Sequence, residues 1–188
     1  MIPELNQSGV LPPFIPERGP TDPAGMAPYG ATISEFVLRY AQSPERIAIL
    51  RGLLGYRRKL REVGFKDGFQ WIDGSFVENV ELNRGRPPGD IDLVTFATRP
   101  TKNDESWRNL VHENSELFLP HLSKEKYVCD AYFVDLSTDP IHVVKSTGYW
   151  FGLFSHQRES YLWKGMIEIP IICDDEDAIE ILKGMGNA

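Results

Sequence analysis

Two aspartates separated by one apolar residue, Asp90 and Asp92, are the residues of this sequence best suited to chemistry. They open the segment DIDLVTF, residues 90–96, whose two-residue alternation predicts a β-strand. Residues i and i+2 of a strand share a face, so the two carboxylates would repel each other unless a cation or water separates them. Hard oxygen ligands at this spacing suit Mg²⁺. The alternative is an exposed strand with a solvated face.

A Gly-Ser pair follows the preceding predicted strand, FQWID, residues 69–73. Gly74 would let a phosphate approach the backbone, and Ser75 adds a hydroxyl donor. A helical turn predicted over residues 75–82 would offer N–H groups to an anion. A Gly-Ser pair alone is usually a plain turn, but here strand, turn, a fourteen-residue spacer and the two acids come in order.

The segment IDGSFVENVELNRGRPPGDIDLVTF resembles the signature of the nucleotidyltransferase superfamily, the polymerase-beta-like fold. That pattern is an apolar residue, Gly, Gly or Ser, a spacer of about this length, then acid, apolar, acid, apolar. The resemblance implies that Asp90 and Asp92 bind two Mg²⁺ ions and that Gly74 and Ser75 contact a nucleoside triphosphate (NTP). The arm IPELNQSGVLPPFI together with the GSFV…DID core also resembles a small group of bacterial and phage proteins with this domain.

The same family usually has a third metal-binding carboxylate on a later, neighbouring strand. Asp130 is the candidate because it lies inside the apolar strand predicted over residues 126–136, where an unpaired acid would be costly. Asp135 is the second choice. The alternative for Asp130 is a buried acid paired with an arginine.

The sequence departs from the family at the turn. Nucleotidyltransferases linked to toxin–antitoxin pairs often carry an arginine just after Gly-Ser, where this chain has Phe76. A cation for the phosphates must therefore come from elsewhere. Arg158 and Lys164 are the preferred candidates, ahead of Arg84 and Arg86 in the loop before the acids. The alternative for each is an exposed loop cation.

Composition limits the classes of function. A net charge of −7 over 188 residues argues against general, charge-driven nucleic-acid binding. A local basic run over residues 51–66 is either an RNA or partner patch or the polar face of an amphipathic helix. No apolar run is long enough to span a membrane, no secretory signal is expected, and two isolated cysteines fit reduced thiols, so a cytoplasmic protein is expected.

The order of expected elements predicts a single α/β (α+β) domain with helices packed on a small mixed sheet. Residues 1–30 form a Pro/Gly-rich arm, expected to be packed over 1–16 and a mobile loop over 17–30, and residues 31–188 form the domain. Helices are expected from Thr32, from Ser43 to about Val63, and over 104–118 and 175–186; further strands are expected over 126–136 and 163–173. The aromatic stretch 148–154 is expected to be core or a strand–loop cover.

These patterns predict a Mg²⁺-dependent nucleotidyltransferase, an ATP-binding or other NTP-binding transferase that moves a nucleoside monophosphate to a hydroxyl on a protein or RNA. A toxin–antitoxin or phage-defence setting, with a cognate toxin as partner, fits the resemblance. The rival hypothesis is a catalytically inactive module of the same fold that binds a partner. A third is nucleotide addition to tRNA ends, which would need the 51–66 basic face to contact RNA.

Overall fold

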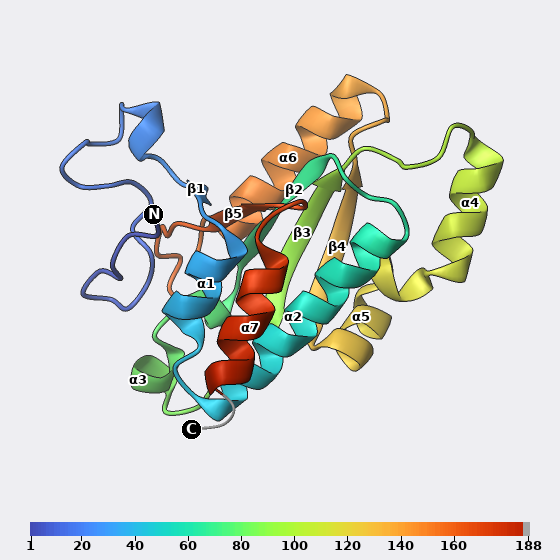
Figure 1. Cartoon of the computed structure of the whole chain (residues 1–188). Helices are drawn as coiled ribbons and strands as arrows, with labels where there is room; N and C mark the ends of the chain where they lie inside the picture. Colours follow the sequence, from blue (N-terminus) through green and yellow to red (C-terminus); the bar gives the residue numbers. More distant parts are fainter. Residues whose placement is uncertain (186–188) are drawn as a thin grey trace.

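The fold is built on one five-stranded mixed sheet, seen in a computed structural model that describes residues 1–185 (Figure 1). The strands are β1 (Tyr29–Gly30), β2 (Gly68–Asp73), β3 (Ile91–Ala97), β4 (Cys129–Asp135) and β5 (Ile167–Pro170). The α-helices of the described residues are α1 (Ile33–Tyr40), α2 (Pro44–Glu62), α3 (Val80–Arg84), α4 (Asp104–Glu113), α5 (Pro120–Tyr127), α6 (Pro140–Phe154) and α7 (Asp175–Met185). The predicted α/β (α+β) class with a small mixed sheet is confirmed.

Strand order in the sheet is β1-β5-β2-β3-β4. β3 pairs with β2 in antiparallel and with β4 in parallel orientation, while β5 pairs antiparallel with β2 and parallel with β1. β3 thus lies between the two strands nearest to it in the chain, and β4 forms one edge.

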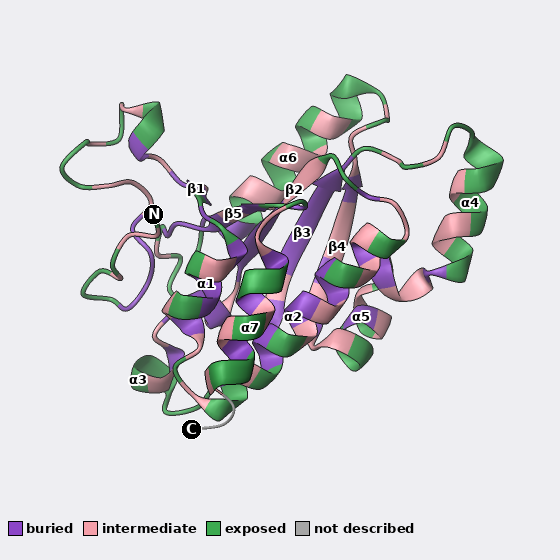
Figure 2. Ribbon diagram, viewed as in Figure 1, coloured by how far each residue is buried: buried purple, intermediate pink, exposed green. Residues whose placement is uncertain are grey.

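The two faces of the sheet are covered unequally. One face packs against α1, α2, α5 and α7, which lie in front of the sheet in Figure 1, and these elements enclose the main hydrophobic core. The other face carries a smaller apolar cluster that includes Trp71, Val94 and Phe96, and α6 covers it through Trp150 and Phe154. β3 is buried along nearly its whole length, as Figure 2 shows.

Helix starts follow the signals in the sequence. Thr32 forms a capping box with Glu35, which begins α1. Ser43 accepts a hydrogen bond from the Arg46 N–H, and Pro44 occupies the first turn of α2, which ends at Glu62 with Val63 as its C-cap. The predictions for these two helices are confirmed.

Other elements differ from the prediction. The aromatic stretch 148–154 is the second half of α6, not a strand–loop cover, because Asp139 caps a helix that starts at Pro140. The strand predicted from residue 126 starts only at Cys129, since α5 occupies the residues before it. The strand predicted over 163–173 is confined to β5.

The arm is also more ordered than the expected loop. Val10 and Leu11 are buried, as expected for the packed part of the arm, residues 1–16. Tyr29–Gly30 adds a short parallel strand beside β5, although it lies in the segment expected to be a mobile loop. α7 runs to Met185, and the last residue of the helix predicted over 175–186 lies outside the described residues. No helix in the described part of the chain is both long and apolar enough to cross a membrane.

Candidate active site

Three carboxylates form a row across three neighbouring strands. Asp92 of β3 is paired in register with Asp73 of β2 on one side and with Asp130 of β4 on the other. Directly paired residues of adjacent strands share a face, so all three side chains project from the face that α6 covers. The structure therefore brings Asp92 and Asp130, both predicted site residues, side by side and adds Asp73 to them.

Asp90 joins this row from the start of β3. It immediately precedes the strand, two residues before Asp92. Lys124 of α5 reaches it, with Nζ 2.5 Å from Asp90 Oδ2. About half of the Lys124 side chain is exposed to solvent (55%), so this ion pair lies at the rim of the row.

The ionised carboxylates of the row repel one another. Burial, and next the charges of Asp90 and Asp130, together raise the pKa of Asp92 to about 6. Burial also raises the pKa of Asp73 to about 7, against the opposing effect of the Lys164 ammonium. A cation placed among these groups would relieve that repulsion.

Gly74 is required by the way the turn passes over Asp92. Its φ is +80°, a backbone conformation that residues with a side chain rarely adopt. A Cβ at this position would lie 1.8 Å from Asp92 Oδ2, which is inside van der Waals contact. The backbone after β2 therefore lies directly against the central carboxylate. Ser75 begins the 3₁₀ turn Ser75–Val77 that follows.

A buried lysine, Lys164, pairs with the carboxylates on either side of the Gly74–Val77 turn. Lys164, only 3% exposed, lies 3.0 Å from Asp73 Oδ1 and 2.8 Å from Glu78 Oε1. Glu78 also accepts a hydrogen bond from Gln157 Nε2 at 2.9 Å. Arg46 donates to the backbone oxygens of Phe76 and Glu78. Lys164 was predicted to contact phosphate, but here its ammonium is shared between two carboxylates under the turn.

The other predicted phosphate contacts lie at the surface: Arg158 and Arg86 are in loops, whereas Arg84 is the last residue of α3 and not in the predicted loop. Arg158 is exposed in the loop between α6 and β5, which Gln157 ties to the turn. Arg84 lies 3.8 Å from Glu159 of the same loop, and Arg86 bonds a neighbouring backbone oxygen. Their contact with a phosphate stays a prediction.

Phe76 leaves no room for a cation at its own position. The side chain is fully buried and packs against the rings of Phe36 and Tyr40. The place where the resemblance leads one to expect an arginine is therefore part of the hydrophobic core. Asp135, the second choice for a third carboxylate, instead forms an ion pair with Arg99 at the far end of β4.

Two site residues were missed from the sequence. Asp73 lies at the end of an apolar strand just before Gly74, and an acid in that position was a usable signal. Lys124 was missed because it lies in α5, a helix that was not predicted.

A divalent cation fits the donor set, with some rearrangement. No group of three or more His, Cys, Asp or Glu side chains within residues 1–185 is already arranged to hold a metal ion. Mg²⁺, however, needs just one or two protein carboxylates and takes its other ligands from water and phosphate. Asp92 and Asp130, paired across adjacent strands, meet that need, and Asp90 would join them on release from Lys124.

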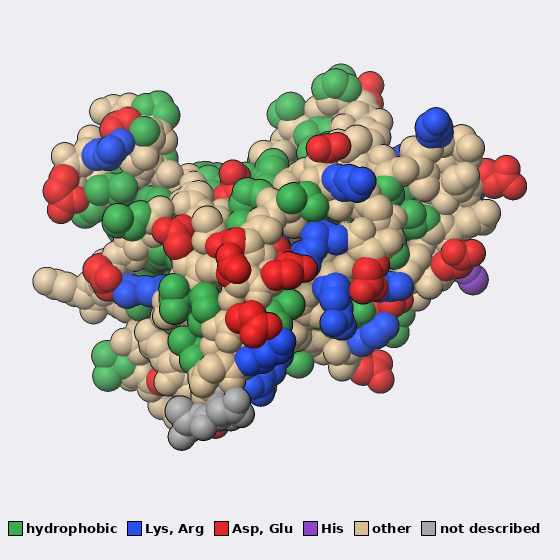
Figure 3. Space-filling view, viewed as in Figure 1, with side chains coloured by type: hydrophobic (Ala, Val, Ile, Leu, Met, Phe, Trp, Pro, Cys, Tyr) green, Lys and Arg blue, Asp and Glu red, His purple; other side chains and the backbone are tan. Residues whose placement is uncertain are grey.

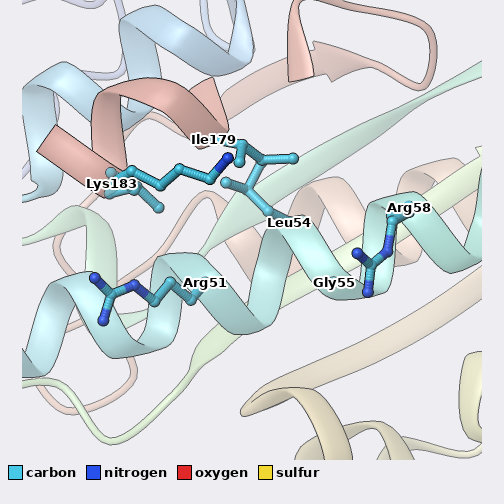
Figure 4. A pocket seen from close by; sticks show the side chains of 7 residues that line it. Arg51, Leu54, Gly55, Arg58, Ile179 and Lys183 are labelled. Carbon is cyan, nitrogen blue, oxygen red and sulfur yellow. The ribbon is translucent and has the colours of Figure 1, made fainter. Parts of the chain in front are cut away.

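The basic run over residues 51–66 divides into buried and exposed parts. Arg57 is buried and binds Asp175, Gln70 and two backbone oxygens, so it is a core residue. Arg51 and Arg58 are exposed and, with Lys183, line a pocket of about 250 Å³ between α2 and α7 (Figure 4). Lys and Arg side chains gather over α2 in Figure 3, with acidic side chains around them. The sheet separates this pocket from the carboxylate row, because α2 and α7 cover the opposite face.

Comparison with known proteins gives one match. The model of a protein family described as a family of unknown function (DUF6932) matches residues 3–170. No curated protein and no solved structure matches the chain. The matched range includes all the site residues described above.

Proposed function

The chain belongs to this family of unknown function, and we propose that it is a Mg²⁺-dependent nucleotidyltransferase. It would move a nucleoside monophosphate from an NTP to a hydroxyl group of a protein or RNA. The observation that carries the proposal is the row of Asp73, Asp92 and Asp130 on one face of the sheet, with the Gly74 backbone against its central member.

A purely structural role explains the row less well, because adjacent carboxylates destabilise the fold. Carboxylates that lie side by side and partly out of water cost folding free energy, because burial and then the neighbouring charges disfavour the ionised form; the pKa of about 6 for Asp92 shows both effects. Proteins place such groups together where a cation is bound or a proton is moved. The resemblance of the GS…DID segment to nucleotidyltransferases specifies which chemistry this would be.

The turn and the carboxylates have different tasks in the proposed reaction, and Asp130 has two. The Gly74–Ser75 turn binds the triphosphate through its backbone and the serine hydroxyl. Asp90 and Asp92, with Asp130, hold Mg²⁺, which would neutralise the phosphates and the leaving pyrophosphate. Asp130 accepts the proton of the attacking hydroxyl.

Atoms and charges balance in this scheme. The acceptor oxygen forms a bond to the α-phosphorus, and the bond from that phosphorus to the oxygen bridging to the β-phosphate breaks. Pyrophosphate leaves, and the hydroxyl proton passes to the carboxylate. The protein contributes position and charge and forms no covalent bond to the substrate.

The direct test is label transfer. The chain is incubated with each of the four α-³²P NTPs, Mg²⁺, and either total RNA or cellular protein as acceptor. We expect label in an acceptor with the parent and with Asp67→Asn, an exposed control near β2, and at least a hundredfold less with Asp90→Asn, on the order of losing a metal ligand. Equal labelling by the parent and Asp90→Asn would refute the proposal.

A non-catalytic module is the second candidate, and two observations favour it. Phe76 is buried where a phosphate-binding cation is expected, and Lys164 is engaged by two carboxylates. The structure of the site would then serve to bind a partner such as a toxin. Calorimetry separates the two: Mg²⁺-dependent NTP binding supports the enzyme, and its absence supports the module.

Nucleotide addition to tRNA ends is tested on the exposed cations of α2. Charge reversal at Arg51 and Arg58 leaves the core intact because both side chains lie at the surface. Unchanged activity in that double variant would remove tRNA recognition by this face. Arg57 is unsuitable for the test, since its loss would disturb the fold.

A further inference from the structure

Lys124 places a positive charge against the carboxylate row. Its Nζ lies 2.5 Å from Asp90 Oδ2. The hydrogen bond to Asp90 raises the pKa of Lys124, and the charges of Asp130 and Asp92 add to that effect. The ammonium therefore contacts Asp90 and adds positive charge at that end of the carboxylate row.

The backbone that carries Lys124 is fixed, while its side chain is free to move. Ser123, the preceding residue, is buried; its hydroxyl donates to the Cys129 oxygen at 2.8 Å and accepts from the Ala131 N–H at 3.3 Å. These bonds fasten the helix to the start of β4, next to Asp130. The Lys124 side chain is 55% exposed, so it can turn without disturbing the core.

A second lysine of α5, Lys126, does not contact the carboxylate row, so the contact is particular to Lys124. It belongs to the same helix, two residues further on, and has a similar exposure of 54%. It pairs with Glu116 at 2.8 Å and lies over the ring of Tyr127, not against the row. The two lysines thus form a matched pair for experiment.

We propose that Lys124 is a displaceable counter-ion of the site: it neutralises Asp90 when no metal is bound and moves to the triphosphate when Mg²⁺ takes that carboxylate. This inference rests on the proposed function and supplies the cationic phosphate contact that Phe76 does not. Lys164 is ill placed for that task because it is buried between Asp73 and Glu78.

The exchange follows from charge. One Mg²⁺ ion would bring two positive charges to Asp90 and Asp92. It would neutralise the carboxylates that attract the Lys124 ammonium and would repel that ammonium. An NTP brings several negative charges to the same place, and a half-exposed ammonium on a fixed helix is well suited to meet them. Without nucleotide, Lys124 and Mg²⁺ would compete for Asp90. With Mg²⁺ and NTP bound, Lys124 and the phosphates would attract each other.

Two opposite effects of one substitution test the inference. The full chain, with Lys124→Met or Lys126→Met, is titrated by calorimetry with MgCl₂ alone and then, in saturating Mg²⁺, with a non-hydrolysable α,β-methylene NTP. We expect Lys124→Met to bind Mg²⁺ alone about two- to fivefold more tightly, the size of a partly exposed ion pair. The same variant should bind the nucleotide about tenfold more weakly, as expected for a lost charge-assisted hydrogen bond.

The controls separate this inference from the proposed function. Lys126→Met should match the parent in both titrations, and Lys124→Arg should retain nucleotide binding. If the parent binds Mg²⁺ and nucleotide but Lys124→Met lacks either effect, the inference is overturned and the proposed function stands. If parent and controls bind neither, the proposed function fails and the inference with it.

Discussion

In the absence of Mg²⁺, Asp92→Asn should stabilise the folded chain at neutral pH. The pKa of Asp92 is raised from 3.8 to about 6 by burial and by its carboxylate neighbours. About 1.4 kcal/mol corresponds to each pKa unit, which gives about 3 kcal/mol as a ceiling. Partial exposure of the side chain screens this, so we expect about 1–2 kcal/mol. For a chain of this size that corresponds to an increase in Tm of about 3–6 °C.

The effect must depend on pH with a definite sign. Because the folded pKa is the higher one, the folded state keeps a proton that the unfolded state loses between about pH 4 and pH 6. The free-energy cost of Asp92 therefore grows as pH rises through this window and is complete above it. Asparagine carries no charge at any pH, so its advantage should be near zero at pH 4 and full at pH 8.

Urea unfolding from pH 4 to 8 in EDTA measures this difference, with Asp67→Asn as the exposed control. Added Mg²⁺ should stabilise the parent and have much less effect on Asp92→Asn. A variant that is less stable than the parent at pH 8 without metal would refute the reasoning. So would a gain that is the same at every pH.

Two further predictions concern the turn and its support. Gly74→Ala should destabilise the fold by about 1–2 kcal/mol more than Gly85→Ala in urea unfolding, because both glycines have positive φ but only the Cβ at Gly74 meets Asp92; equal losses would contradict this. Lys164→Met should cost about 3–5 kcal/mol by leaving Asp73 buried without its cation. That loss should be smaller at pH 5 than at pH 8 in thermal unfolding, since the carboxylates left behind can then take up protons; a loss independent of pH would argue against the assigned pairing.

Local patterns in the sequence were enough to predict the strand, turn and helix caps at the centre of the candidate site. The alternation of β3, the Gly-Ser turn and the caps of α1 and α2 depend on residues within a few positions of one another. Asp130 was placed correctly in a strand because an acid within an apolar run is itself conspicuous. Its position beside Asp92, however, comes from the register between β3 and β4.

What the sequence could not supply depends on long-range pairing. Asp73 belongs to the row only because β2 and β3 pair so that it faces Asp92. From the sequence, Lys164 is indistinguishable from an exposed loop cation. In the folded chain the end of β2 and the following turn place the carboxylates of Asp73 and Glu78 against it. These relations exist only in the assembled sheet.

The basic run contains a buried residue, Arg57, that local periodicity does identify. Arg57 lies four residues after Leu53 and three before Leu60, both buried residues of α2, so helical periodicity places it on the core face. A binding patch and the polar face of a helix, the two predictions for this run, both imply that Arg57 is exposed, and both are wrong at this residue. The structure satisfies its charge with Asp175 from α7.

β4 lies at the edge of the sheet, and one carboxylate of the candidate site belongs to it. The row is therefore complete only while this edge strand stays paired with β3. Asp73 and Asp92 lie on β2 and β3, strands that are each paired on both sides. Asp130 lies on β4, which has one neighbouring strand among residues 1–185. Brief detachment of that edge would withdraw one carboxylate while the rest of the sheet stays folded. Hydrogen exchange of the β4 amides would thus report how often the row is complete, and a bound cation should slow that exchange more than it slows exchange in β2.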